Sequence, residues 1–150
     1  MKIALSRALF NIFGLFEGDF DTLKNAKNLS KKLEDFKTSP TIKIGMFVKL
    51  ILNHHTFHLK LEKFLKTEEP SYNTESTKES SEFVVYNRAW FYLNQVDLNN
   101  KEDIFAVLDF NPKILNSALE SAILYFQNRE EYEKCAHIFK FQQILKESKR

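Results

Sequence analysis

The stretch that decides the fold is residues 41–66, which reads TIKIGMFVKLILNHHTFHLKLEKFLK. Apolar residues and one histidine recur every three or four positions along it, and lysines occupy another face. This spacing is typical of an amphipathic helix of about six turns. The first residues alternate like a strand, so we expect the helix to start near Gly45. The recurring residues are Phe47, Leu50, His54, Phe57, Leu61 and Phe64.

The composition of the 150 residues favours helices throughout. Hydrophobic residues make up 43% and charged residues 28%, which is typical of a soluble globular protein. The chain has 15 Phe but only 3 Gly and 3 Pro, too few turn-forming residues for a β-sandwich or barrel. We therefore expect an all-α protein of about six helices with Phe as the main core residue.

Helical spacing and capping signals recur on both sides of residues 41–66. An N-terminal helix is expected to end near Gly18, and a break at Thr38-Ser39-Pro40 follows the second helix. Further helices are expected over residues 83–96, through Leu108, from Asn111 onward and over residues 130–146. The N-terminal helix is predicted from apolar residues at helical spacing, which are Leu5, Leu9, Ile12, Phe13, Phe16 and Phe20. The helix over residues 130–146 is predicted from the apolar arc of Tyr132, Cys135, Ala136, Phe139 and Leu145.

Charge divides the chain into three segments. Residues 1–66 carry a net charge of +6, residues 67–82 carry −4, and residues 83–150 carry zero. The middle segment is rich in Ser, Thr and Glu and contains no aliphatic residue. Such a composition is typical of a linker or of a loop that orders on binding. The sequence thus predicts a basic helical half and a C-terminal helical-hairpin half joined by an acidic linker. Packing of both halves into one domain stays open.

The cysteine count and the length of the apolar stretches indicate the cellular compartment. The single Cys135 cannot form an intramolecular disulfide, which fits a reducing environment. No apolar stretch reaches the roughly 18–20 residues that span a bilayer. We therefore expect a cytoplasmic protein without a membrane partner. The Lys- and Asn-rich, Arg-poor composition suits an A/T-rich bacterial or phage genome.

A histidine cluster is the nearest the sequence comes to a metal site. His54 and His58 are one helical turn apart, which suits two imidazoles on one metal ion, and Glu62 is the nearest candidate third ligand. His54 also belongs to the apolar stripe, so we favour a hydrogen-bonded core histidine. No catalytic constellation is recognisable, and we expect a non-enzymatic protein without a cofactor.

An aromatic surface is the more suggestive feature. The helix over residues 83–96 is apolar nearly all round, so it is either central to the core or half-covered by a partner. In the second case Trp90, Phe91 and Tyr92, with Tyr132 of the last helix, are the expected partner-binding residues.

The terminal hairpin, residues 119–145, resembles two helical-hairpin modules. Its phrase Tyr132-Glu133-Lys134-Cys135-Ala136 resembles the opening of the second helix of the UVR motif. The same stretch is similar to a tetratricopeptide-type hairpin, with Ala118, Tyr125, Tyr132 and Ala136 at packing positions. Either resemblance implies protein–protein docking.

These observations predict an interaction protein: an adaptor, an inhibitor or a small subunit of a larger assembly. The alternative is an accessory protein that binds nucleic-acid backbone weakly and without sequence preference. Arg7 is the only arginine among residues 1–66, so lysines would make those contacts. They are Lys24, Lys27, Lys31, Lys49, Lys60 and Lys63.

Overall fold

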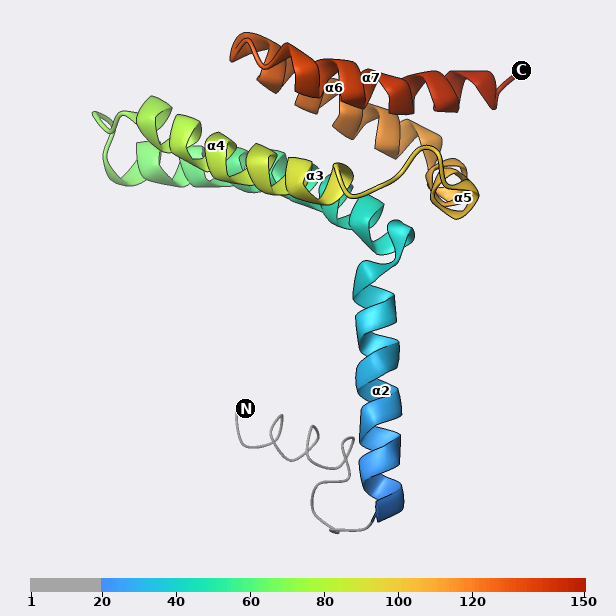
Figure 1. Ribbon diagram of the computed structural model, residues 1–150. Coiled ribbons are helices and arrows are strands. Elements are labelled where there is room, and N and C mark those ends of the chain that lie inside the picture. The colour runs from blue at the N-terminus through green and yellow to red at the C-terminus, as the bar shows by residue number, and fades with distance from the viewer. Residues whose placement is uncertain (1–19) are drawn as a thin grey trace. The chain divides into compact units, whose positions relative to one another are not determined.

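The computed structural model describes residues 20–150, with side chains from residue 24 onward. The predicted N-terminal helix lies outside the described residues. Residues 20–150 form six helices and contain no strand, so the predicted all-α class is confirmed for this part of the chain (Figure 1). The helices are α2 (Phe20–Thr38), α3 (Pro40–Glu68), α4 (Thr74–Leu93), α5 (Lys101–Asp109), α6 (Pro112–Asn128) and α7 (Tyr132–Glu147).

The chain divides into two compact units, Met1–Ser39 and Pro40–Arg150. The predicted break at Thr38-Ser39-Pro40 is confirmed, because α2 ends at Thr38 and α3 begins at Pro40. A proline is tolerated there because the first turn of a helix leaves its N–H groups unbonded. The division between units therefore falls here and not within residues 67–82. In the first unit, the side chains of Leu33 and Phe36 on α2 are exposed.

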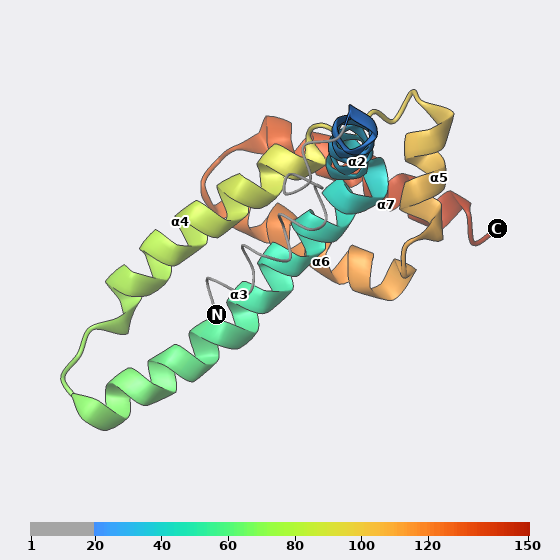
Figure 2. The same ribbon diagram turned by 90° about the horizontal axis from the view of Figure 1, so that it is seen from below.

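The second unit consists of two helical hairpins and one short helix (Figure 2). α3 runs antiparallel to α4, and α6 runs antiparallel to α7. The α6–α7 hairpin and α5 pack on one side of the α3–α4 hairpin, which we call the covered side. The end of the α3–α4 hairpin at residues 69–73 extends beyond α6 and α7 in both views (Figures 1 and 2).

The core lies where these hairpins meet. Three phenylalanines, Phe47, Phe126 and Phe141, are among its largest fully buried side chains, as the composition predicts. Many other phenylalanines are exposed, so Phe fills the core and also covers surface. The buried apolar residues are Ile44, Phe47, Val48, Ile51, Ala89, Leu93, Val96, Ala106, Val107, Leu115, Ala118, Leu119, Ala122, Tyr125, Phe126, Ile138, Phe141 and Leu145.

Aromatic rings join α4 to the α6–α7 hairpin. Tyr86 stacks on Tyr125, with ring centroids 4.3 Å apart and planes 7° from parallel. Trp90 meets Phe126 edge-on at 6.1 Å and His137 at 5.3 Å. Such pairs stabilise packing by about 0.5–1.5 kcal/mol beyond the area they bury. Large rings therefore bridge helices whose backbones stand further apart.

The acidic segment, residues 67–82, differs from its prediction as a linker. α3 continues to Glu68 and α4 begins at Thr74, so residues 69–73 alone connect them. Asn73 caps α4, its side chain accepting from the N–H of Glu75 at 3.0 Å. An acidic residue in the first turn adds a favourable interaction with the helix dipole. A capped helix that packs on one side only does not need a full apolar stripe.

The start of α3 also differs from expectation. The helix begins at Pro40 rather than near Gly45, because Ile44 already belongs to its packed face. Ile44 is fully buried, and a helix places it beside Phe47, Val48 and Ile51. The short alternating pattern was therefore the start of a helical stripe and not a strand.

The helix α6 begins with the predicted cap, whereas α7 has no side-chain cap and buries a different face from the predicted one. Asn111 accepts from the N–H groups of Lys113 and Ile114 at 3.1 and 3.2 Å, with Pro112 in the first turn. Glu130 has φ 59°, so the left-handed turn delays α7 to Tyr132. The predicted apolar arc of α7 was partly wrong, since Tyr132, Ala136 and Phe139 are exposed. The buried face consists of Ile138, Phe141, Gln142 and Leu145.

Candidate interaction surface

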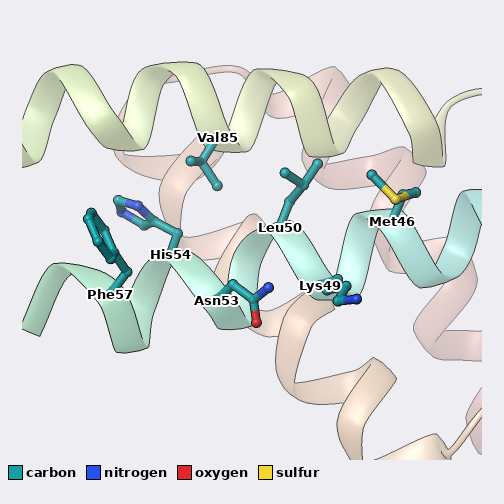
Figure 3. A pocket seen from close by; sticks show the side chains of 7 residues that line it. All are labelled: Met46, Lys49, Leu50, Asn53, His54, Phe57 and Val85. Carbon is teal, nitrogen blue, oxygen red and sulfur yellow. The ribbon is translucent and has the colours of Figure 1, made fainter. Parts of the chain in front are cut away.

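A groove of about 460 Å³ lies on the other face of the α3–α4 hairpin (Figure 3). We call this face the open side, because no other helix of the second unit packs on it. Its apolar lining comes from Met46, Leu50 and Phe57 of α3 and from Val85 of α4. Its polar lining comes from Lys49, Asn53 and His54.

The groove follows from two adjacent apolar stripes on α3. Phe47 and Ile51 point to the covered side, whereas Leu50 and Phe57 line the groove. A helix places such neighbouring positions about 100° apart, so both stripes form when most of a surface is apolar. On the α4 side the lining is the short side chain of Val85 alone, which leaves the space open. Phe57 keeps 63% of its surface exposed.

His54 stands at the edge of this groove as a neutral polar group. Its ring lies 5.8 Å from the ring of His58 and 6.4 Å from the ring of Tyr86. Burial lowers the pKa of His54, the nearby His58 lowers it further, and the carboxylate of Glu82 opposes both. Because its pKa lies below the ordinary value, His54 is uncharged at neutral pH.

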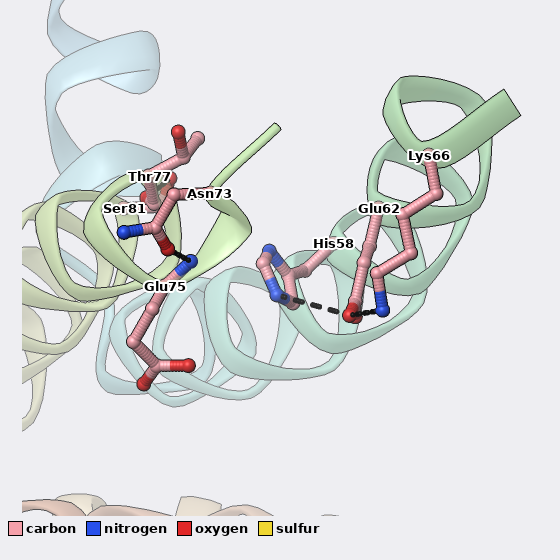
Figure 4. A network of polar contacts seen from close by, with 7 residues as sticks. All are labelled: His58, Glu62, Lys66, Asn73, Glu75, Thr77 and Ser81. Carbon is pink, nitrogen blue, oxygen red and sulfur yellow. Dashed lines mark hydrogen bonds and ion pairs between the residues drawn. The ribbon is translucent and has the colours of Figure 1, made fainter. Parts of the chain in front are cut away.

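A chain of polar contacts continues from His58 toward the far end of the hairpin (Figure 4). His58 Nε2 lies 3.9 Å from Glu62 Oε2, and Lys66 Nζ donates to Glu62 Oε1 at 2.8 Å. That hydrogen bond, helped by the charge of Lys66, holds the pKa of the Glu62 carboxyl below its usual range. His58 Nδ1 is buried without a hydrogen-bond partner among the described residues.

The two weak candidates for metal ligands, His54 and His58, lie against each other. The rings of His54 and His58 stack at an interplanar angle of 26°. Glu62, the candidate third ligand, pairs with Lys66. No group of three or more His, Cys, Asp or Glu side chains within residues 20–150 is placed to hold a metal ion.

The predicted partner-binding aromatics do not form one patch. Trp90 is half-buried among Phe126 and His137 on the covered side. Phe91 is 52% exposed and meets the ring of Tyr92 at 5.5 Å, and the guanidinium of Arg88 lies over both rings. Tyr132 is exposed at the start of α7.

The predicted basic residues belong to both units. Lys24, Lys27 and Lys31 are exposed on α2, in the first unit. The other three are exposed on α3 in the second unit, where Lys49 lines the groove. These other three are Lys49, Lys60 and Lys63.

Sequence reasoning missed Met46 and Val85 as lining residues. It placed Phe47, Leu50 and Phe57 on one face, because their spacing fits a single stripe. The signal that separates them is the width of the apolar surface, since Met46 and Leu50 are one turn apart beside the Phe47–Ile51 stripe.

Comparison of the chain with protein-family models, with curated proteins and with solved structures gives no significant match. Among the described residues, no helix combines the length and the hydrophobicity that a membrane span requires.

Proposed function

We propose that this chain is a non-enzymatic interaction module that binds a partner helix in the groove on the open side of the α3–α4 hairpin. The observation that carries the proposal is the groove itself, an apolar channel lined by Leu50, Phe57 and Val85. Large exposed apolar surfaces in monomeric proteins mark interaction sites.

The dimensions of the groove suit a helix. Its lining runs from Met46 to Phe57 along α3, which is about 16 Å at the rise of an α-helix. That length matches about three turns of a partner helix, whose anchors would be spaced at i, i+3 or i+4, and i+7. Half-exposed aromatic and aliphatic side chains such as Phe57 are the usual anchors of this binding mode.

The charges around the groove select an acidic partner. Lys49 lines it, and Lys60 lies three helical turns further along the same edge of α3. Arg88 is exposed on α4 one turn after Val85. The carboxylates of Glu79 and Glu82 on α4 do not line the groove but a different pocket, although the charge of Glu82 acts on His54. The proposed partner is therefore an amphipathic helix with an apolar stripe and acidic flanks.

A pair of synthetic helices tests this proposal. Both carry leucines at i, i+4 and i+7; one has glutamates at the flanking positions and the other has lysines. Fluorescence anisotropy with the full chain should show saturable binding of the glutamate peptide alone. Phe57→Ser should weaken that binding about thirtyfold, because a central anchor contributes about 2 kcal/mol. Lys49→Glu should weaken it a few-fold and remove much of its salt dependence.

Phe105→Ser is the matched control, since Phe105 is 70% exposed on α5 and does not line the groove. Equal losses for the two Phe→Ser variants would contradict the groove as the binding site. A short DNA duplex is the comparison ligand. Binding of the duplex with the same lysine dependence, and no binding of the acidic peptide, would favour the nucleic-acid alternative instead.

A further inference from the structure

A second pocket, of about 550 Å³, lies between the start of α4 and the end of α6. Three carboxylates of α4 line it, those of Glu75, Glu79 and Glu82. They belong to the acidic segment whose net charge of −4 is the lowest of the chain's three segments. None of these three residues lines the groove on the open side.

These carboxylates form a row along α4. Their spacing of four and three residues places them on one face of α4, at rises of about 6 and about 4.5 Å. None of the three forms an ion pair with any residue from 24 to 150. Like charges one turn apart destabilise a helix by a few tenths of a kcal/mol, and the dipole of α4 offsets this only for Glu75 in its first turn.

A buried hydroxyl gives a second, independent sign of a ligand. Tyr125 lines the same pocket and keeps only 9% of its surface exposed. Its Oη is buried without a hydrogen-bond partner among the described residues. The stacked ring of Tyr86 fixes the position of Tyr125. Buried polar atoms are nearly always hydrogen-bonded, so an unpaired one beside a pocket invites a donor from a ligand.

The two basic residues that line the pocket form no ion pair with these carboxylates. The guanidinium of Arg129 lies over the rings of Phe83 and Tyr125, at 5.4 and 5.6 Å. Lys78 also lines the pocket, so three negative charges face two positive ones. The carboxylates extend along the helix instead of converging on a point, and no three acidic side chains among the described residues are placed around one ion.

We propose that this pocket binds a linear polyamine, whose ammonium groups pair with Glu75, Glu79 and Glu82 and donate to Tyr125 Oη. Ammonium groups separated by three or four methylenes repeat along a polyamine much as the carboxylates repeat along α4. A flexible polycation therefore matches the row better than one compact cation does. The proposal does not rest on the groove, whose lining shares no residue with this pocket.

Isothermal titration of the full chain with spermidine at low salt tests the proposal. We expect saturable binding to one site. Glu79→Gln should weaken it about tenfold by removing the middle carboxylate, because hydrogen bonds to charged groups are the stronger class. Tyr125→Phe should weaken it about threefold through loss of the acceptor oxygen. Both changes keep the side-chain shape, and the fluorescence of Trp90, the single tryptophan, verifies the fold.

Glu133→Gln is the matched control, an exposed glutamate of α7 that does not line this pocket. Spermidine affinity equal for Glu79→Gln and Glu133→Gln, or no saturable binding at all, would overturn the proposal. Two further titrants test which kind of cation the pocket prefers. Tighter binding of N-acetyl-arginine amide would indicate a peptide side chain, and equally tight binding of magnesium chloride would indicate an inorganic cation. Either result would overturn the polyamine assignment.

Discussion

Both sides of the α3–α4 hairpin carry apolar side chains, but they differ in how far those side chains are buried. On the covered side Phe47 is fully buried, whereas on the open side Phe57 is 63% exposed beside the groove. Both residues belong to the same helix and to the same apolar periodicity. The difference shows that, within the second unit, an apolar stripe predicts burial only where another of its helices packs on that stripe.

The largest expected effect separates these two phenylalanines. Phe47→Ala should lower the free energy of unfolding by about 3–5 kcal/mol, because it leaves a cavity in a packed core. Phe57→Ala should change it by less than about 0.5 kcal/mol, as substitutions at exposed sites do. Urea unfolding followed by circular dichroism measures both. A loss above about 2 kcal/mol for Phe57→Ala would show that the open side is covered in the folded chain.

The neighbouring residues Trp90 and Phe91 repeat the comparison on α4. Trp90 packs against Phe126 and His137, so Trp90→Ala should cost about 2 kcal/mol, less than a fully buried tryptophan. Phe91 is 52% exposed, and Phe91→Ala should cost less than about 0.5 kcal/mol. The same unfolding experiment decides. Equal costs would mean that α4 is buried on both sides.

Much of the fold could be predicted because its signals are local. The cap at Asn111 with Pro112 and the apolar set of α6 specify that helix within one stretch of chain. The start of α4 was missed because its support is a side-chain cap at Asn73 and not an apolar stripe. Composition alone cannot distinguish a capped polar helix from a linker.

The candidate groove could not be predicted for a different reason. The sequence indicates that α3 is apolar on a broad surface, and it does not say which part α6 and α7 cover. Leu50 lines the groove and Ile51 is in the core, although the two are adjacent in sequence. Their difference arises from the packing of helices distant in sequence.

The caps of α6 and α4 allow a further comparison, between a helix of the core and the exposed end of the α3–α4 hairpin. Asn111 caps α6, which belongs to the core, so Asn111→Ala should lower the global unfolding free energy by about 1 kcal/mol. Asn73 caps the exposed start of α4, and Asn73→Ala should act locally. Hydrogen exchange should show faster exchange in residues 74–80 for Asn73→Ala with little change in global stability. A global loss equal to that of Asn111→Ala would contradict this distinction.

The smallest effect concerns pH and two histidines, one on each side. Burial lowers the pKa of His137 on the covered side, and Lys140 lowers it further. As the pH falls through the ordinary histidine value near about 6.5, the unfolded chain takes up a proton that the folded chain does not. Stability should therefore be highest above that pH and decrease until the pH reaches the lowered pKa of the folded state.

His137→Phe should flatten this decrease, because it removes the titrating group and the buried Nε2 that has no partner among the described residues. His54→Phe should flatten it as well, because burial and the neighbouring His58 lower the pKa of His54, although Glu82 opposes both. Urea midpoints between about pH 7 and about pH 5 measure both slopes. If His137→Phe keeps the full slope of the native chain, the proton uptake belongs elsewhere. If His54→Phe keeps the full slope, the folded chain takes up a proton at His54 as the unfolded chain does, and the imidazole at the edge of the groove is then in contact with water.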